Sequence, residues 1–147
     1  MHLDHNRKSP VMEFEDDEQL MECVAEWQKI LFLEDWIIQA SLHDMPLLDE
    51  NDQELQGRNR FCVDLKSSFI SVIRPNDDAR SRIVKFCAEC TLVHELLHCK
   101  YNWLAPPSPR TLEGAYFDTM EHGLLEQMSK SLIMARYHLP FEWFKNF

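Results

Sequence analysis

The chain has 147 residues, 45% of them hydrophobic, which is the size and apolar content of one domain with its own core. Its net charge of −10 argues against sequence-independent binding to nucleic acid, and its three scattered glycines cannot form a glycine-rich phosphate loop. No apolar run reaches the roughly eighteen residues that span a membrane, and the polar N-terminus lacks a secretory signal, so we expect a cytoplasmic protein.

The N-terminal part of the chain predicts a tail followed by a helix. Residues 1–12 have little apolar character, so we expect a flexible tail there and a single domain over residues 13–147. Acidic residues between Glu13 and Glu22 suit the positive end of a helix dipole and indicate where this helix begins. Its apolar residues recur at helical spacing, and they are Leu20, Cys23, Val24, Trp27, Ile30 and Leu31.

Three short strands are expected next, over residues 36–42, 60–65 and 69–73, with a polar, acidic loop at 43–57. The first strand is rich in β-forming residues. Its expected inward face consists of Trp36, Ile38, Ala40 and Leu42. The second strand alternates, and its expected inward residues are Phe61, Val63 and Leu65. These patterns predict a small, mostly antiparallel sheet.

Helices dominate the second half of the chain. Residues 79–104 contain no glycine or proline and keep a helical period of apolar residues, which predicts one long buried helix. A proline-rich loop at 105–109 and a last helix over 116–137 follow. The C-terminal segment, 139–147, carries four aromatic residues that we expect to cover the core. The order helix, three strands, two helices predicts an α+β domain.

The long helix contains the motif H-E-x-x-H, formed by His94-Glu95-Leu96-Leu97-His98. Residues four apart lie above one another on a helix, so both imidazoles can reach one metal ion. Glu95 can then hydrogen-bond a water on that metal and act as general base. The motif therefore predicts one Zn²⁺ per chain, bound by His94 and His98. The simpler alternative is a pair of hydrogen-bonded core histidines with an exposed Glu95.

A catalytic zinc site needs a third protein ligand, and the last helix offers Glu121, His122 and Glu126. Glu126 is the favoured ligand because it shares a semi-apolar helical face with His122, whereas Glu121 falls on an adjacent strip that we expect nearer to solvent. His122 and Glu121 remain alternatives. Candidate donors to the oxyanion that forms during hydrolysis are Tyr116, Tyr137, His122 and His138.

The H-E-x-x-H motif with a downstream helical glutamate resembles the gluzincin type of zinc metallopeptidase. The chain is similar over about residues 18–136 to the very small members, which include the minigluzincins, SprT-like domains and H-E-x-x-H proteins of phages and other mobile elements. The resemblance implies a zinc-dependent endopeptidase with a peptide or protein substrate and a small sheet over the active-site helix. SprT-like proteases often act at DNA and carry basic regions, but this acidic chain has none of comparable strength, so we expect no nucleic-acid partner. Because no apolar run is long enough to span a membrane, we expect no membrane partner. The resemblance also implies an edge strand that binds an extended peptide, here residues 69–73.

Two other functions compete with this interpretation: a zincin-fold binding or regulatory module without proteolysis, and a metal-dependent hydrolase of a non-peptide amide.

The sequence Cys87-Ala88-Glu89-Cys90 is a C-x-x-C expected within the long helix, where we interpret its thiols as core residues. All five cysteines are expected to be reduced, and most of them buried. A further hypothesis is that the aromatic segment 139–147 lies near the active-site cleft and restricts access to it.

Overall fold

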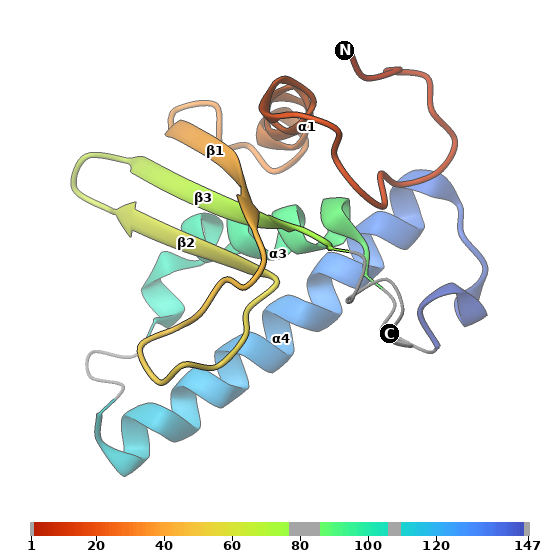
Figure 1. Ribbon diagram of the computed structural model, residues 1–147. Helices are drawn as coiled ribbons and strands as arrows, with labels where there is room; N and C mark the ends of the chain where they lie inside the picture. Colours follow the sequence, from red (N-terminus) through yellow and green to blue (C-terminus); the bar gives the residue numbers. More distant parts are fainter. Residues whose placement is uncertain (1, 77–85, 106–109, 146–147) are drawn as a thin grey trace.

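The structure, a computed structural model, describes residues 2–76, 86–105 and 110–145 (Figure 1). The helices and strands in this part are α1 (Asp17–Ile30), β1 (Ile37–Asp44), β2 (Gly57–Cys62), β3 (Ser67–Arg74), α3 (Ala88–Lys100) and α4 (Leu112–Tyr137), with 3-10 turns η1 (Asn102–Leu104) and η2 (Phe141–Phe144). The predicted α+β class is confirmed. None of the helices within the described ranges has the length and apolar character needed to cross a membrane.

Helix α1 begins as the acidic residues predicted. The side chain of Asp16 caps the helix by accepting a hydrogen bond from the backbone amide of Gln19 at 2.8 Å, and Asp17 and Glu18 follow in the first turn. Four of the six residues at the predicted apolar spacing are buried within the helix, and Leu31 is buried just beyond it. Ile30, the last residue of the helix, is 44% exposed.

The sheet is mixed, with strand order β1-β3-β2. Strand β1 pairs with β3 in parallel, and β2 pairs with β3 antiparallel, so the prediction of a mostly antiparallel sheet was wrong. The long connection after β1 leads to β2 at the far edge of the sheet. The position next to β1 is thereby left for β3, which becomes the central strand. Residues 69–73 therefore belong to the central strand, and the edge strand packed against α3 is β2.

The inward faces of the strands were partly predicted. Trp36, Ile38 and Ala40 are buried as expected. Val63 and Leu65 were expected inside but are 45% and 72% exposed. The reason is that β2 ends at Cys62, after which residues 63–66 form a turn in which the Lys66 amide bonds to the Val63 carbonyl. The apparent alternation of this segment runs from the strand into the turn.

Helix α3 is half as long as the pattern of residues 79–104 predicted. Residues 77–85 lie outside the described residues, but Phe86 and Cys87 are not helical, and Cys87 has the extended backbone of an N-cap. The first two amides of α3 donate hydrogen bonds to the N-terminal segment. The amide of Ala88 donates to the Met12 carbonyl and that of Glu89 to the Val11 carbonyl, each at 3.0 Å. The helix thus begins where the N-terminal segment satisfies its free amide groups.

The N-terminal residues 2–12 form no helix or strand, yet they are tied to the domain through a buried charged cluster, the Glu89 cluster. The carboxylate of Glu89 is fully buried and accepts hydrogen bonds from four side chains. The donors are Arg7 at 3.1 Å, Trp27 at 2.8 Å, Arg136 at 3.1 Å and Tyr137 at 2.5 Å. This cluster joins the N-terminal segment, α1, α3 and α4 at one end of the molecule.

Helices α1 and α3 pack on one face of the sheet, and α4 lies along α3 on the side away from the strands (Figure 1). The core between these layers is built around Leu20, Trp27, Ile70, Val72, Leu92, Leu96, Leu125 and Ile133. On the opposite face of the sheet, Ile37 and Phe69 are 69% and 50% exposed. Helix α3 consequently runs between β2 and α4, and this position determines what surrounds its H-E-x-x-H motif.

Candidate metal centre

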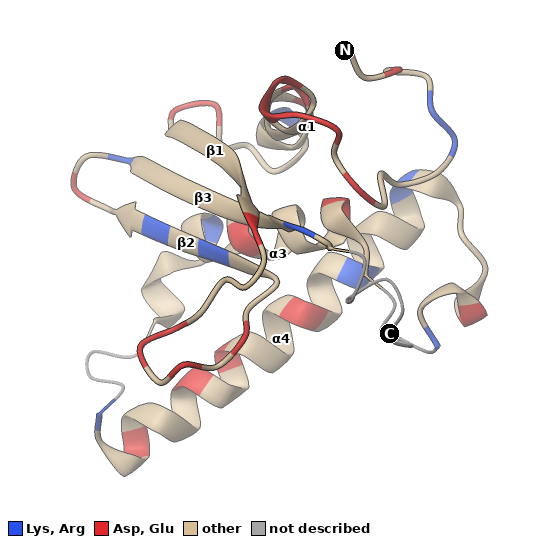
Figure 2. Cartoon of the chain, viewed as in Figure 1, with Lys and Arg blue, Asp and Glu red and all other residues tan. Residues whose placement is uncertain are grey.

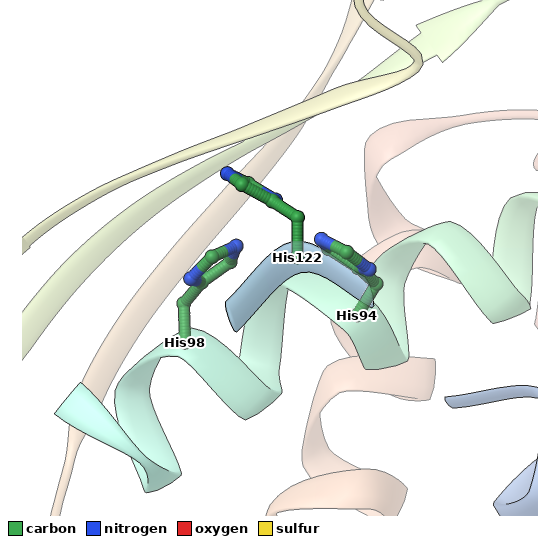
Figure 3. A group of neighbouring side chains, drawn as sticks. All are labelled: His94, His98 and His122. Carbon is green, nitrogen blue, oxygen red and sulfur yellow. The ribbon is translucent and has the colours of Figure 1, made fainter. Parts of the chain in front are cut away.

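Three histidines from two helices, α3 and α4, lie close together (Figure 3). His94 and His98 stand one turn apart on α3, and α4 brings His122 against them. Each offers one ring nitrogen such that the three nitrogens lie within 4.8 Å of one another. The ring centroids are 5.0 to 5.7 Å apart. Three imidazoles match in number and kind the protein ligands of a catalytic zinc site.

Glu121 supports this histidine cluster from α4. Its Oε1 accepts a hydrogen bond from His98 Nδ1 at 3.0 Å, which leaves the other ring nitrogen of His98 for a metal. Glu121 is only 6% exposed, so the expectation that it lies nearer to solvent was wrong. The buried line of α4 runs in four-residue steps from Glu121 through Leu125 and Ser129 to Ile133, and this line sets the rotation of the helix.

Glu126, the favoured third ligand from the sequence, lies beside the cluster. Its side chain is 50% exposed, against 51% for His122, with one oxygen 3.1 Å from His94 Nδ1 and the other 3.4 Å from Lys130 Nζ. The contact with His94 lacks the geometry of a hydrogen bond, and among the described residues this buried nitrogen has no hydrogen-bond partner. The structure therefore places His122 within the three-residue group and Glu126 beside it.

Glu95 lies beneath β2, next to the histidines, and is 7% exposed. Burial raises the pKa of its carboxyl to about 7, against the opposing influence of His94. The backbone of Gly57 passes so close that a Cβ there would stand 2.7 Å from Thr91 Cγ2 and 3.2 Å from Glu95 Oε1. Only glycine permits this approach, so Gly57 fixes the space in which the Glu95 carboxylate lies.

Asn59 is a site residue that the sequence did not reveal. Its side-chain amide donates to the Glu95 carbonyl at 2.7 Å, and its Oδ1 accepts from the Ser68 hydroxyl at 2.5 Å. These bonds couple β2 and β3 to the turn of α3 that carries the motif. The sequence does contain a signal for Asn59. Side chains alternate along β2, so Gly57, Asn59 and Phe61 share the face toward α3, and Asn59 is the polar residue on that face.

The cluster favours neutral imidazoles at two of its three histidines. Burial lowers the pKa of His98 to about 3, with contributions from the neighbouring His94 and His122. Burial also lowers the pKa of His122. At His94 burial acts in the same direction, but nearby carboxylates, first that of Glu126, outweigh it and raise the pKa. The neutral imidazole is the form that binds a metal.

Two cavities meet at the histidines. One of about 730 Å³ runs along β2 and is lined by residues that include Arg58, Asn59, His98, Glu121 and His122. The other, of about 370 Å³, shares Gly57, Glu95 and His122 and continues along α3 and α4. Strand β2 carries basic residues opposite a loop rich in acidic ones (Figure 2). The centre is thus open to ligands from two directions.

The candidate oxyanion donors occupy different environments. The Tyr137 hydroxyl donates to Glu89 and belongs to the buried Glu89 cluster. Tyr116 is 64% exposed. His138 forms the left-handed C-cap of α4. Of the four candidates, His122 is the one that the structure brings into the histidine cluster.

The C-x-x-C motif stands at the start of α3 and not within a helix as predicted. Cys87 is the N-cap, and its sulfur accepts from the amide of Cys90 at 3.4 Å. Both residues are buried, and burial raises the pKa of both thiols to about 12. Four of the five cysteines are buried, as expected, and Cys62 is exposed. The raised pKa values fit the interpretation of Cys87 and Cys90 as core thiols.

Comparison of the chain with known protein families, with curated proteins and with solved structures finds no match.

Proposed function

We propose that the chain is a zinc-dependent endopeptidase in which His94, His98 and His122 bind the metal and Glu95 is the general base. The observation that carries the proposal is the convergence of three imidazoles beside the buried carboxylate of one H-E-x-x-H motif. The buried Nδ1 of His94, which has no hydrogen-bond partner in the part of the chain that the structure describes, and the donor set both fit a zinc ion. Glu126 is the alternative third ligand.

A bound zinc ion would polarise the carbonyl of the substrate and lower the pKa of a water molecule. Glu95 accepts the proton of the attacking water on its carboxylate and delivers it to the nitrogen of the leaving amine. Glu121 holds the His98 ring in one orientation through Nδ1. Gly57 and Asn59 hold β2 over Glu95, so the base stays within reach of the scissile bond.

The peptide substrate would bind in extended form along β2. This strand lies at the edge of the sheet and lines the larger cavity next to His98 and His122. An edge strand offers backbone donors and acceptors to an added strand. The role that the family resemblance assigned to residues 69–73 therefore passes to Gly57–Cys62 in this proposal.

The test is cleavage of a quenched fluorescent peptide library by the zinc-loaded chain. We expect cleavage that a chelator abolishes, and we expect Glu95→Gln to reduce kcat/KM by about 10²- to 10⁴-fold while the zinc content is unchanged. Cleavage at the unaltered rate by Glu95→Gln, or no cleavage of any peptide, would contradict the proposal. A zinc-bound but inert chain would support a binding module, and turnover of small amides alone would support the non-peptide hydrolase.

A further inference from the structure

Helix α4 carries a ridge of exposed apolar side chains. The helix has 26 residues and packs on α3, which has 13, so within the described part of the chain its outer side stays uncovered (Figure 1). Along this side the apolar ridge runs in four-residue steps, formed by Leu112, Tyr116, Met120 and Leu124, which are 91%, 64%, 52% and 46% exposed. Large apolar side chains gathered on one exposed face mark an interaction surface.

A row of smaller residues lies next to the apolar ridge on α4. It consists of Ala115, Thr119, Gly123, Gln127, Ser131 and Ala135, and each of them is exposed. Neither this row nor the row of the ridge holds a charged residue between Leu112 and Ala135, although 27% of the chain is charged. The outward face of a helix in water ordinarily carries charged residues. The two rows are therefore typical of a surface that another molecule covers.

The apolar ridge and the row beside it are complementary in shape. Two helices pack when a ridge of residues four apart on one enters a groove on the other. The row of Ala115, Thr119 and Gly123 is such a groove, because its side chains are short. Two copies related by a two-fold axis can each place the ridge in the groove of the other, as an isologous interface requires. The middle of both features lies near Thr119 and Met120, and the axis would pass there.

We propose that this face of α4 binds the same face of a second copy, so that the chain forms a homodimer whether or not it binds zinc. The two rows expose on the order of 800 Å² per copy, as much as each partner buries in an interface of standard size. Two chains of charge −10 repel each other, and along these two rows they can meet without burying an acidic side chain.

The charges of α4 favour a second copy over a membrane surface. A helix that lies on lipid carries Lys and Arg beside its apolar face. The Asp, Glu, Lys and Arg residues of α4 before Lys130 are all acidic, and they are Glu113, Asp118, Glu121 and Glu126. An anionic lipid surface would repel this part of the helix.

The test is the mass of the chain in solution, measured by sedimentation equilibrium over the micromolar range. We expect twice the 17.5 kDa of one chain. Met120→Glu should raise the Kd of the dimer at least about tenfold, because it places two like charges together near the axis. Phe141→Glu is the matched control, since Phe141 is 85% exposed and lies outside α4, and it should leave the Kd unchanged. A chain that is monomeric throughout, or a dimer that Met120→Glu leaves intact, overturns the proposal.

An exchange of charges distinguishes a second copy from any other occupant of this face. Met120→Arg alone should associate as weakly as Met120→Glu. An equal mixture of the two variants should restore the dimer, because opposite charges then meet near the axis. Circular dichroism shows whether both variants are folded, and a mixture of folded variants that stays monomeric overturns the proposal. Binding of the unaltered chain as a monomer to phosphatidylcholine vesicles would assign the face to a membrane and also overturn it.

Discussion

Glu121 accepts a hydrogen bond from Nδ1 of His98. In metal sites such a bond fixes the tautomer and the orientation of the ligand ring. Replacing Glu121 by Gln removes the carboxylate but keeps the shape of the side chain. We expect the affinity for zinc to fall about 10- to 100-fold, as is common when such a supporting group is lost. Competition with a chromophoric chelator measures this affinity.

Glu113→Gln is the matched control for that experiment. Glu113 lies on the same helix α4, is exposed and is absent from the lining of both cavities. Its substitution should leave zinc affinity unchanged. Equal affinities of the Glu121→Gln and unaltered chains would show that the negative charge of Glu121 beside His98 has no part in metal binding.

At the scale of residues, the pairing of His94 with His98 could be predicted because it depends only on the period of one helix. The position of a third ligand could not, because it depends on how α4 is rotated against α3. That rotation is set by a buried line that includes two polar residues, Glu121 and Ser129, which a search for apolar periodicity passes over. His122 accordingly lies within the three-histidine group, and Glu126 lies beside it.

The close approach of β2 to α3 makes Gly57 a sensitive position between two elements. In Gly57→Ala the new methyl group would meet Thr91 Cγ2 at 2.7 Å and Glu95 at 3.2 Å. We expect β2 to be displaced and kcat to fall about 10- to 100-fold, because small displacements of a catalytic group have effects of this size. We also expect a loss of about 1–3 kcal/mol in the free energy of unfolding, measured by urea denaturation.

For Gly123→Ala on α4 we expect the opposite effect on stability. A Cβ at Gly123 meets nothing within 4 Å, and alanine favours a helix interior. The unfolding free energy should therefore rise by about 0.5–1 kcal/mol. If Gly57→Ala were as active and as stable as Gly123→Ala, the proposed positioning of Glu95 by β2 would be wrong.

At the scale of elements, α1 and β1 were predictable because their signals are local: an acidic N-terminus, helical spacing, and alternation. The start of α3 was not predictable, because nothing between residues 79 and 88 interrupts the apolar period. The helix begins at Ala88 where residues Val11 and Met12, far away in sequence, accept its first amide hydrogens. The same dependence on distant segments explains why β3 enters between β1 and β2.

At the scale of the whole molecule, a charged network joins the N-terminal segment, α1 and α4. Glu26 on α1 accepts hydrogen bonds from Arg7 at 2.9 Å and from Arg136 at 2.7 Å. Burial alone would raise the pKa of Glu26, but these bonds, and one from His5, outweigh it and lower the pKa to about 2. A carboxyl whose pKa is lower in the folded state stabilises the fold above its unfolded pKa, and this contribution is lost as the pH falls through the folded value.

We therefore expect the free energy of unfolding to decline as the pH falls from about 4.5 toward 2, and to decline less steeply in Glu26→Gln. Urea denaturation at pH 6, 4 and 3 measures this. Glu34→Gln, which alters an exposed residue, serves as control and should follow the unaltered chain. Identical pH profiles for Glu26→Gln and the unaltered chain would show that the network contributes nothing to acid sensitivity.

The charge of the whole molecule has limited bearing on the metal centre. Eleven of the acidic residues lie in two stretches, 13–22 and 44–54, at the start of α1 and in the region between β1 and β2. The proposed ligands come from neither stretch, since they are supplied by α3 and α4. These eleven acidic residues thus supply none of the proposed metal ligands, and three of them, Asp49, Glu50 and Glu54, line the two cavities.

The most direct test of the central claim is the zinc content of the purified chain and of two variants, His122→Ala and Glu126→Ala, by elemental analysis. We expect about one zinc per chain, lost in His122→Ala and retained in Glu126→Ala. Loss in Glu126→Ala with retention in His122→Ala would assign the third ligand to the carboxylate. A folded, unaltered chain that binds no zinc when supplied with it would contradict the metal centre itself.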